Sequence, residues 1–375
     1  MKIEDLERFQ ATKRLPKTFI EEIPNLVAAV INRECNLNCK HCDWPLKHSV
    51  HEEYLSSQDW NSSIKNFSLT GSKKKKDKTI VISGREPLYD QDSREKLMSV
   101  LASSRAQGIY AGFITNGINL PFLFKEYPNF IPDFMDISLE GPKEINDQIR
   151  GAGFFEKAMA GFKLALQKVE KLFISITVTA INIQAIPSFI QDMVHLGVKQ
   201  FVFHSLVPGE FVAPGIQTED DDFLEMIKKI KQLADKLKLE QVIFDLYPPS
   251  FKNFPRIIEE IKPEELFVDN YIVMSLAQNV FVRFVNLLES YTVSFLVSPE
   301  GYVVTPLEMR MIDYLKNKEN RQHIQNILAW DGNPYANEII KLAKNISDIC
   351  FEQKCFKFCL GQNSFCPITK KRRKK

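Results

Sequence analysis

Three cysteines lie within eight residues of this chain, in the segment CNLNCKHC that runs from Cys35 through Cys39 to Cys42. The spacing, Cys-x3-Cys-x2-Cys, lets three thiolates on one loop converge on a single metal centre. Structural zinc sites are normally closed by four protein ligands, so a set of three points away from zinc. A [4Fe–4S] cluster held by three thiolates keeps one iron free to bind another molecule. The segment therefore predicts an iron–sulfur site with one open coordination position.

A second group of four cysteines lies near the end of the chain. Its spacing, Cys-x4-Cys-x3-Cys-x6-Cys, brings together enough thiolates to close one site, either an iron–sulfur cluster or a four-cysteine zinc site. Clustered cysteines of this kind are typical of metal ligands in a reducing compartment rather than of a disulfide framework. We therefore expect a cytoplasmic protein. The second group consists of Cys350, Cys355, Cys359 and Cys366.

The composition is that of a globular protein with a large core. The 375 residues are 44% hydrophobic and 26% charged, as is usual for such proteins. No run of 18 apolar residues is present, so we expect no transmembrane helix, and the N-terminus MKIEDLERFQ is too polar for a signal peptide. Two basic runs, 73–76 and 370–375, lack interleaved aromatic residues, and we interpret them as solvated segments. We expect neither a membrane nor a nucleic acid as partner.

The elements that must position these cysteines alternate along the middle of the chain. Strands separated by helices imply parallel βαβ units, and six such units form most of a β/α barrel. The predicted fold is therefore α/β, a partial (β/α)6 TIM-like barrel. Apolar runs predict strands at 26–31, 79–83, 111–115, 134–139, 173–180 and 200–206, and amphipathic patterns predict helices at 93–107, 155–169, 186–196 and 218–237.

The distinctive segments of the sequence all follow predicted strands. The cysteine loop follows the first strand, residues 84–87 follow the second, Asn116-Gly117 follows the third, and residues 140–142 follow the fourth. In β/α barrels, chemistry gathers in the loops after the carboxyl ends of the strands. We therefore expect these four segments to face one cavity.

The pattern changes after about residue 245. Segments 293–297 and 302–305 flank Ser298-Pro299-Glu300-Gly301, which predicts a β-hairpin, and a helix is predicted at 335–345. We expect residues 207–290 to supply substrate contacts. The predicted organisation is an N-terminal segment (1–24), a core domain (25–245), a C-terminal region (246–369) made of the hairpin, the helix and the cysteine-rich end, and a basic, disordered tail (370–375).

The cysteine loop resembles, almost literally, the motif of the radical S-adenosylmethionine (SAM) superfamily. The resemblance implies that Cys35, Cys39 and Cys42 hold a catalytic [4Fe–4S] cluster whose open iron binds the amino and carboxylate groups of SAM. An electron, from a donor such as flavodoxin or ferredoxin, then cleaves SAM to methionine and a 5′-deoxyadenosyl radical, which takes a hydrogen atom from the substrate. The cofactors supply this chemistry, and the protein positions and shields it. An unrelated zinc loop is the alternative.

The segment ISGREPL at 82–88 resembles the Gly-Gly-Glu-Pro segment of that family. The resemblance implies that Glu86 accepts a hydrogen bond from the SAM amino group, while Gly84 lets the backbone approach the ligand closely. Arg85 replaces the second glycine, and we expect this long cation to turn away from the ligand. A turn with a surface salt bridge is the alternative.

Segment 136–151 resembles the family's fourth strand and the helix after it. There Ser138 would face the SAM ribose or carboxylate, and Arg150 would pair with the methionine carboxylate, as suits a guanidinium. Glu140 stands where an aspartate is more usual. The alternatives are an ordinary strand serine and a surface arginine. The resemblance makes Asn116 and Thr179 further cofactor contacts, and Asn182, His204 and Leu206 could line the cavity.

The C-terminal cysteines and the hairpin resemble the auxiliary-cluster extension called SPASM or twitch. The resemblance implies one auxiliary [4Fe–4S] cluster, held by the four cysteines of the second group. The hairpin ends in Thr305-Pro306 without a cysteine, so the ligands for a second auxiliary cluster are missing. A four-cysteine zinc site is the alternative.

Enzymes with such an extension most often modify ribosomally made peptides or proteins. The resemblance therefore implies a peptide or protein side chain as substrate, and crosslinking, oxidation or epimerisation as the outcome. Oxidation or rearrangement of a small biosynthetic intermediate is the alternative enzyme reaction. A zinc-binding nucleic-acid module, with two cysteine sites and a basic tail, is the non-enzyme alternative, and the predicted barrel argues against it.

Overall fold

The computed structural model describes residues 26–42, 53–69, 78–209, 212–247, 250–261, 265–268, 272–284, 294–301 and 303–304. Within these ranges the strands join into one sheet of 12 strands. The strands are β1 (Leu26–Val30), β2 (Thr79–Ser83), β3 (Tyr110–Thr115), β4 (Phe134–Ser138), β5 (Leu172–Val178), β6 (Gln200–Ser205), β7 (Gln241–Leu246), β8 (Glu265–Val268), β9 (Ile272–Ala277), β10 (Val280–Phe284), β11 (Ser294–Val297) and β12 (Val303–Val304).

Seven strands, β1 to β7, lie side by side in chain order, and all of these pairs are parallel. β10 extends the parallel row beyond β7, and β11 extends it beyond β1 on the other side. The outer strands are antiparallel, because β12 pairs with β11 while β9 joins β10 to β8. Segments late in the sequence therefore form both margins of the sheet.

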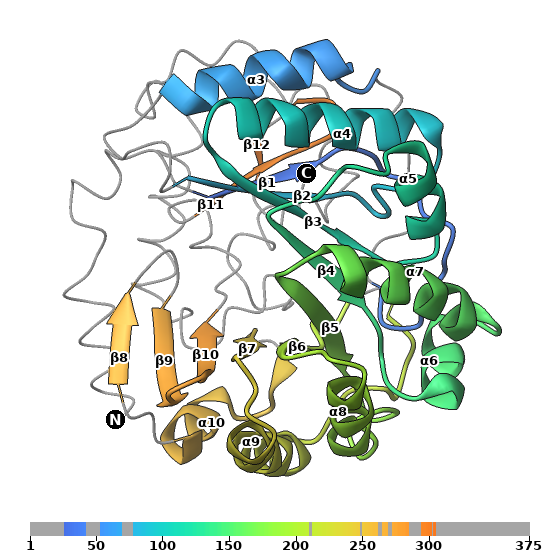
Figure 1. Cartoon of the computed structure of the whole chain (residues 1–375). Coiled ribbons are helices and arrows are strands. Elements are labelled where there is room, and N and C mark those ends of the chain that lie inside the picture. Colours follow the sequence, from blue (N-terminus) through green and yellow to red (C-terminus); the bar gives the residue numbers. More distant parts are fainter. Residues whose placement is uncertain are drawn as a thin grey trace, which may run out of the picture.

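The helices lie around the outside of the curved sheet (Figure 1). α4 begins after Asp90, whose side chain accepts a hydrogen bond from the Ser93 backbone N–H, an ordinary N-cap. The helices are α3 (Ser57–Leu69), α4 (Gln91–Ala106), α5 (Leu120–Glu126), α6 (Lys143–Arg150), α7 (Phe154–Lys168), α8 (Ile186–His195), α9 (Asp220–Lys236) and α10 (Phe254–Ile261). In the described part of the chain, none of them has the length and apolar character that a membrane-spanning helix needs.

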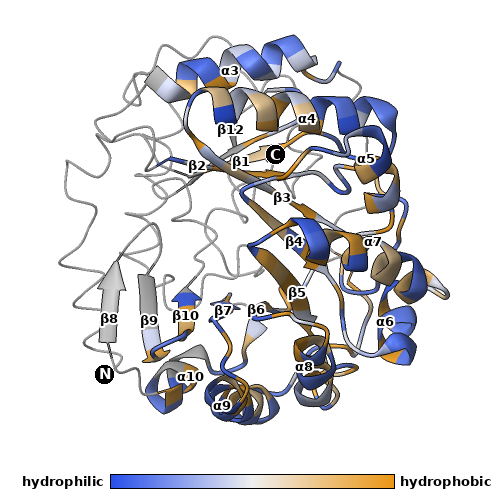
Figure 2. Ribbon diagram, in the orientation of Figure 1, coloured by the Kyte–Doolittle hydropathy of each residue, from blue (hydrophilic) through white to orange (hydrophobic). Residues whose placement is uncertain are grey.

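The hydrophobic core lies between the sheet and the surrounding helices. Side chains alternate between the two faces of a strand, and in β5 Ile174 and Ile176 are fully buried while Phe173 and Thr177 are only half-buried. Figure 2 shows the hydrophobic colour concentrated on strands such as β3 and β5, while α3 is mostly hydrophilic. The face of β5 that carries Phe173 and Thr177 is thus less buried than the face that carries the two isoleucines.

The predicted α/β barrel and its six strands are confirmed, with small differences at the strand ends. The predicted hairpin is also present, as β11 and β12. β7, which spans residue 245, and β10, which continues the parallel row beyond it, were not predicted. The division of the chain at residue 245 stays a prediction. The helix at 335–345, the second cysteine group, the N-terminal segment and both basic runs lie outside the described residues.

The turn between β11 and β12 packs against the start of the cysteine loop. Arg33, which precedes the loop, is buried and forms two hydrogen bonds with Glu300 of this turn, at 2.7 and 2.8 Å. The Leu55 backbone N–H also donates to the Pro299 carbonyl at 2.7 Å. A segment near residue 300 therefore helps to hold a loop near residue 35.

Candidate active site

The three cysteines of the loop line one cavity, of about 200 Å³, at the carboxyl ends of β1 to β4. All three are free thiols and half-buried. The cavity also contains four of the six predicted cofactor contacts, namely Gly84, Asn116, Ser138 and Arg150, whereas Glu86 and Thr179 do not line it. The other lining residues are Leu37, His41, Arg85, Ile114 and Thr115.

Gly84 has no room for a side chain. A Cβ atom there would lie 2.3 Å from Asn32 Oδ1. Asn32 is buried, and its Nδ2 donates to the Glu86 carbonyl at 2.7 Å and to Ser93 Oγ at 2.9 Å. The close approach thus fastens the loop after β2 to the end of β1, beside the cysteines.

Gly84→Ala is expected to lower the free energy of unfolding by about 1–3 kcal/mol, because the added methyl group must displace a buried, hydrogen-bonded asparagine. Urea unfolding measures the loss. The matched experiment repeats the substitution in an Asn32→Ala background, where the blocking oxygen is gone and the additional cost of the alanine should be smaller. Equal costs in the two backgrounds would contradict this explanation.

Glu86 is fully buried and connects the ends of β2 and β3. Its Oε1 accepts hydrogen bonds from Leu88 N (3.0 Å) and Thr115 Oγ1 (2.7 Å), and its Oε2 accepts one from Asn116 N (2.7 Å). Asn116 Nδ2 in turn donates to Asn36 Oδ1 of the cysteine loop at 2.8 Å. Glu86 therefore positions the loop through Asn116, and a contact between Glu86 and SAM stays a prediction.

Glu86→Gln is expected to remove a decline in stability between about pH 4.5 and pH 7. Burial raises the pKa of Glu86 from 4.5 to about 7 in the folded chain. As pH rises, the unfolded chain therefore releases this proton first, and the free energy of unfolding falls across the interval by up to about 3 kcal/mol. Glutamine has no proton to lose, so urea unfolding of the variant should lack this decline.

The same variant carries a cost that does not depend on pH. The glutamine amide nitrogen cannot accept a hydrogen bond, so one of the three donors around position 86 loses its partner. We expect the variant to be about 1–3 kcal/mol less stable at pH 4.5. Parallel pH profiles for the wild-type chain and the variant would contradict the assignment of the decline to Glu86.

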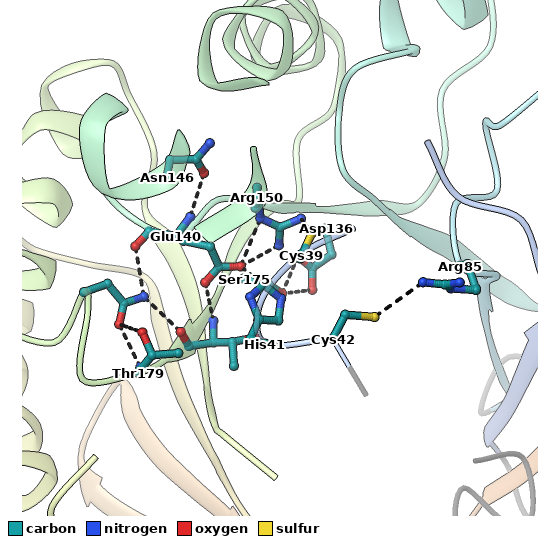
Figure 3. Close-up of polar contacts among 12 residues, drawn as sticks. Cys39, His41, Cys42, Arg85, Asp136, Glu140, Asn146, Arg150, Ser175 and Thr179 are labelled. Atoms are coloured by element: carbon teal, nitrogen blue, oxygen red, sulfur yellow. Dashed lines mark hydrogen bonds and ion pairs between the residues drawn. The ribbon is translucent and has the colours of Figure 1, made fainter. Parts of the chain in front are cut away.

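A second buried carboxylate, Glu140, supports the other side of the cysteine loop (Figure 3). Its Oε1 accepts from Arg150 Nη2 (2.5 Å) and Nε (3.1 Å), and its Oε2 accepts from Thr177 N (2.9 Å). Arg150 Nη1 lies 4.0 Å from Cys39 Sγ, and His41 Nε2 lies 3.6 Å from Glu140. Burial lowers the pKa of His41 to about 4, so this imidazole is neutral near pH 7.

Thr179 and Asn182 form a hydrogen-bonded pair that holds the backbone of Glu140. The Thr179 backbone N–H and hydroxyl both donate to Asn182 Oδ1, at 2.8 and 3.1 Å, and Asn182 Nδ2 donates to the Glu140 carbonyl at 3.0 Å. Both side chains are fully buried, and neither lines the cavity. A contact of Thr179 with the cofactor therefore stays a prediction.

His204, which the sequence analysis singled out, belongs to a charged row on the face of the sheet away from the helices. Thr177, His204, Asp245 and Arg283 stand opposite one another on β5, β6, β7 and β10. Arg283 donates two hydrogen bonds to Asp245, at 2.6 and 2.7 Å, and His204 Nδ1 lies 3.2 Å from Asp245 Oδ2. Burial acts to raise the pKa of Asp245. The positive charge of Arg283 and hydrogen bonds from His204 and Arg283 nevertheless hold this pKa well below its usual range.

Asp245 and Arg283 were not predicted as site residues, and neither was Asp136, which accepts a hydrogen bond from Ser175 Oγ at 2.5 Å. Burial raises the pKa of Asp136 to about 6. The signal that could have identified them is a single charged residue inside an otherwise apolar strand, as in QVIFDL and VFVRF.

Leu206 is buried and is not among the lining residues of the cavity.

The donor set of the cavity suits an iron–sulfur cluster, because three thiols line it and thiolates are the ligands that such clusters select. Among the described residues, no group of three His, Cys, Asp or Glu side chains is arranged around one ion. Burial raises the pKa of the Cys35 thiol to about 12 and also raises that of Cys39, while the positive charges of Arg85 and Arg150 act in the opposite direction. Thiols must lose their protons to bind metal, and these two cations favour that loss.

The Arg85 side chain corrects one expectation, because it does not turn away from the site. It lines the cavity, and its Nη2 lies 3.7 Å from Cys42 Sγ (Figure 3). Its Nη1 is buried and has no hydrogen-bond partner among the residues that the structure describes. The chain thus presents two guanidinium groups to its three cysteines, Arg150 near Cys39 and Arg85 near Cys42.

Comparison with known proteins identifies a family and several relatives. Residues 30–193 match the model of the Radical SAM superfamily, which confirms the resemblance of the cysteine loop to that family. A stretch of 199 residues is 26% identical to the AdoMet-dependent heme synthase of Oleidesulfovibrio alaskensis, covering 52% of this chain and 49% of that protein. The chain spans about half the length of the curated relatives it matches.

Solved structures share the fold at low sequence identity. Streptococcus suis SuiB bound to precursor peptide SuiA superimposes with a TM-score of 0.57 at 13% identity, over 84% of this chain and 65% of that one. The anSMEcpe protein with bound AdoMet and Cp18Cys peptide gives 0.57 at 16% identity, over 90% and 88%. These likenesses support the predicted barrel, while the resemblance of the C-terminal region to SPASM or twitch stays a prediction.

Proposed function

We propose that this radical SAM enzyme holds a [4Fe–4S] cluster on Cys35, Cys39 and Cys42 and cleaves SAM there to take a hydrogen atom from its substrate. The observation that carries the proposal is the shared cavity, in which all three thiols meet the glycine at the end of β2 and the polar ends of β3 and β4. When bound, the cluster and SAM supply the electron and the radical.

The protein's own residues would fix the geometry of the site. Glu86 and Asn116 hold the cysteine loop from the side of β3, and Glu140 with Arg150 holds it from the side of β4. The Lys40 backbone N–H also donates to the Ile149 carbonyl of α6 at 2.9 Å. Rigid placement of this kind is what a protein contributes to cofactor chemistry. Gly84, Asn116, Ser138 and Arg150 remain the proposed SAM contacts.

Anaerobic reconstitution tests the proposal. The full chain is expected to bind about eight irons, about four for the SAM cluster and about four for an auxiliary cluster on the second cysteine group. Under a reductant it should release 5′-deoxyadenosine from SAM. A chain that binds zinc and no iron would instead support the nucleic-acid module, and a chain replete in cluster that releases no 5′-deoxyadenosine with candidate substrates would overturn the proposed reaction.

The auxiliary cluster has its own control within this experiment. Cys355→Ser should lower the bound iron by about four atoms per chain while leaving the SAM cluster in place. A zinc atom lost in the same variant would favour the four-cysteine zinc site.

We also propose a low-potential protein such as flavodoxin or ferredoxin as electron donor, and a cytoplasmic location.

A peptide or protein side chain is the substrate class that we propose first. Both SuiB and anSMEcpe are seen with peptides bound, and the shared fold places a sheet of the same kind in this chain. The charged row of His204, Asp245 and Arg283 lies on the face of the sheet opposite the described helices and would supply polar partners to a substrate there. Mass spectrometry of peptides encoded beside this chain, after incubation with the enzyme and SAM, tests the class.

A small biosynthetic intermediate is the second candidate, and one observation favours it. The relative matched over 199 residues is named an AdoMet-dependent heme synthase, and heme is a small molecule. Incubation with a carboxylate-bearing tetrapyrrole, followed by mass spectrometry, is the matching experiment. A mass change in the tetrapyrrole together with unchanged peptides would favour this candidate over the first.

A further inference from the structure

The two arginines at the cysteine loop differ in how their charges are balanced. Arg150 is buried against Glu140, whose carboxylate accepts two of its hydrogen bonds, at 2.5 and 3.1 Å. Arg85 forms no ion pair with any carboxylate of the described residues, and its hydrogen-bond partner there is Cys42 Sγ, at 3.7 Å. The positive charge of Arg150 is thus locally neutralised, whereas no carboxylate of the described residues neutralises that of Arg85.

The guanidinium of Arg85 also has spare hydrogen-bonding capacity. Its Nη1 is shielded from solvent and has no partner among the described residues. An unsatisfied buried donor costs about 1–3 kcal/mol, so most such groups in native proteins have an acceptor. Arg85 lines the same cavity as the three cysteines, where sulfur atoms of a bound cluster would be acceptors.

A positive charge beside an iron–sulfur cluster affects its redox equilibrium. Reduction adds one electron, so a neighbouring cation stabilises the reduced form more than the oxidised form. Net charge, hydrogen bonds to the sulfurs and solvent exposure all set the reduction potential of such clusters. Charges also interact more strongly in a partly buried site than in water.

We infer that Arg85 is a positioning residue that raises the reduction potential of the [4Fe–4S] cluster, through its unneutralised charge and its hydrogen bond to Cys42 Sγ. The inference rests on the proposed function, since it needs the cluster on the three cysteines. It also explains why a long cation at this position reaches into the cavity. The electron that the cluster must receive would then come from a weaker reductant than a neutral residue at position 85 would require.

An anaerobic redox titration followed by electron paramagnetic resonance tests the inference in the full, reconstituted chain. Iron is counted first, and the SAM-binding cluster is recognised by the change of its signal when SAM is added. Arg85→Gln removes the charge, and Arg85→Lys keeps it. Arg105→Gln, at an exposed position of α4 outside the cavity, makes the same change in net charge and serves as the matched control.

Arg85→Gln is expected to shift the equilibrium away from the reduced cluster by at least about tenfold, which corresponds to about 59 mV for a one-electron couple. Arg85→Lys should stay within about threefold of the wild-type chain, and Arg105→Gln should match it. SAM affinity, measured by equilibrium binding, is expected to change less than the redox equilibrium.

Several results would overturn the inference. One is an unchanged potential in Arg85→Gln, and another is a tenfold loss of SAM affinity without a redox shift, which would place Arg85 on SAM instead. If Arg85→Gln holds no cluster, Arg85→Met supplies the neutral side chain in its place and is expected to show the same shift. A tenfold shift in Arg85→Lys contradicts a role of charge in either case. A wild-type chain without a [4Fe–4S] cluster defeats the proposed function itself, whereas a normal cluster insensitive to Arg85 defeats only this inference.

Discussion

Cys39→Ser protein is expected to fold, to bind about four fewer irons than the wild-type chain and to release no 5′-deoxyadenosine from SAM. Serine is nearly the size of cysteine but is not a thiolate, and soft thiolate ligands are what iron–sulfur clusters select. Cys39 lies between the other two cysteines of the loop and lines the cavity with them, so two thiolates cannot replace three. Iron and sulfide analysis with a cleavage assay measures both losses.

The matched control for this variant lies in the same loop. Asn38 precedes Cys39 and is exposed, so Asn38→Ser changes the loop without removing a ligand. It should keep its iron and its cleavage activity. Should Cys39→Ser retain the full iron content and release 5′-deoxyadenosine at the wild-type rate, the assignment of the loop as cluster ligand would be wrong.

Glu140→Ala is expected to destabilise the chain by about 3–5 kcal/mol, because it leaves the buried Arg150 without its carboxylate. The glutamate has no exposed surface, and it also accepts a hydrogen bond from the Thr177 backbone, so no nearby water replaces what is lost. The cysteine loop should loosen as well, since Arg150 lies against Cys39. Urea unfolding measures the stability, and the rate of iron loss to a chelator measures the loop.

Glu144→Ala is the control for that experiment, since Glu144 is an exposed residue of the same helix, α6. A surface change of this kind should stay within about 0.5 kcal/mol of the wild-type value. The double variant Glu140→Ala/Arg150→Ala removes both charges and should recover part of the loss, because no unpaired ion remains. Additive costs in the double variant would contradict a buried ion pair.

The parts of the site that could be predicted from the sequence are those encoded locally. The spacing of Cys35, Cys39 and Cys42 is a property of eight consecutive residues, and it identified the loop. The strand before it and the strands before Gly84 and Asn116 were visible as short apolar runs. Because parallel strands place their carboxyl ends along the same edge, the meeting of these segments in one cavity followed from the predicted topology.

The contacts that could not be predicted depend on register and on partners far along the chain. Glu86 is satisfied by Thr115 and Asn116, 29 and 30 residues later. Asp245 meets Arg283 only because β10 pairs in parallel with β7. The chain reaches β10 through two antiparallel pairings, β8 with β9 and β9 with β10. A one-residue shift of either strand would send these side chains to the opposite face, and no local pattern fixes that register.

Arg85 shows a different limit of sequence reasoning. A long, charged side chain in place of a glycine suggests that it avoids the ligand, because that is the simplest steric solution. The structure instead gives it a sulfur acceptor in the cavity, Cys42, 43 residues earlier in the chain. The direction of a flexible side chain depends on its acceptors, which only the folded arrangement reveals.

The pairing of β11 with β1 has a consequence for the order in which the molecule is completed during synthesis. β1 is made early, yet its second neighbour is separated from it by most of the chain, and the Arg33–Glu300 contact spans 267 residues. At ribosomal rates of about 5–20 residues per second, roughly 13–50 s pass between the emergence of the two strands. Contacts of such sequence separation form late in folding. The cysteine loop therefore exists on the nascent chain well before the turn that holds Arg33 at its base, and this contact is completed only after β11 and β12 have been made.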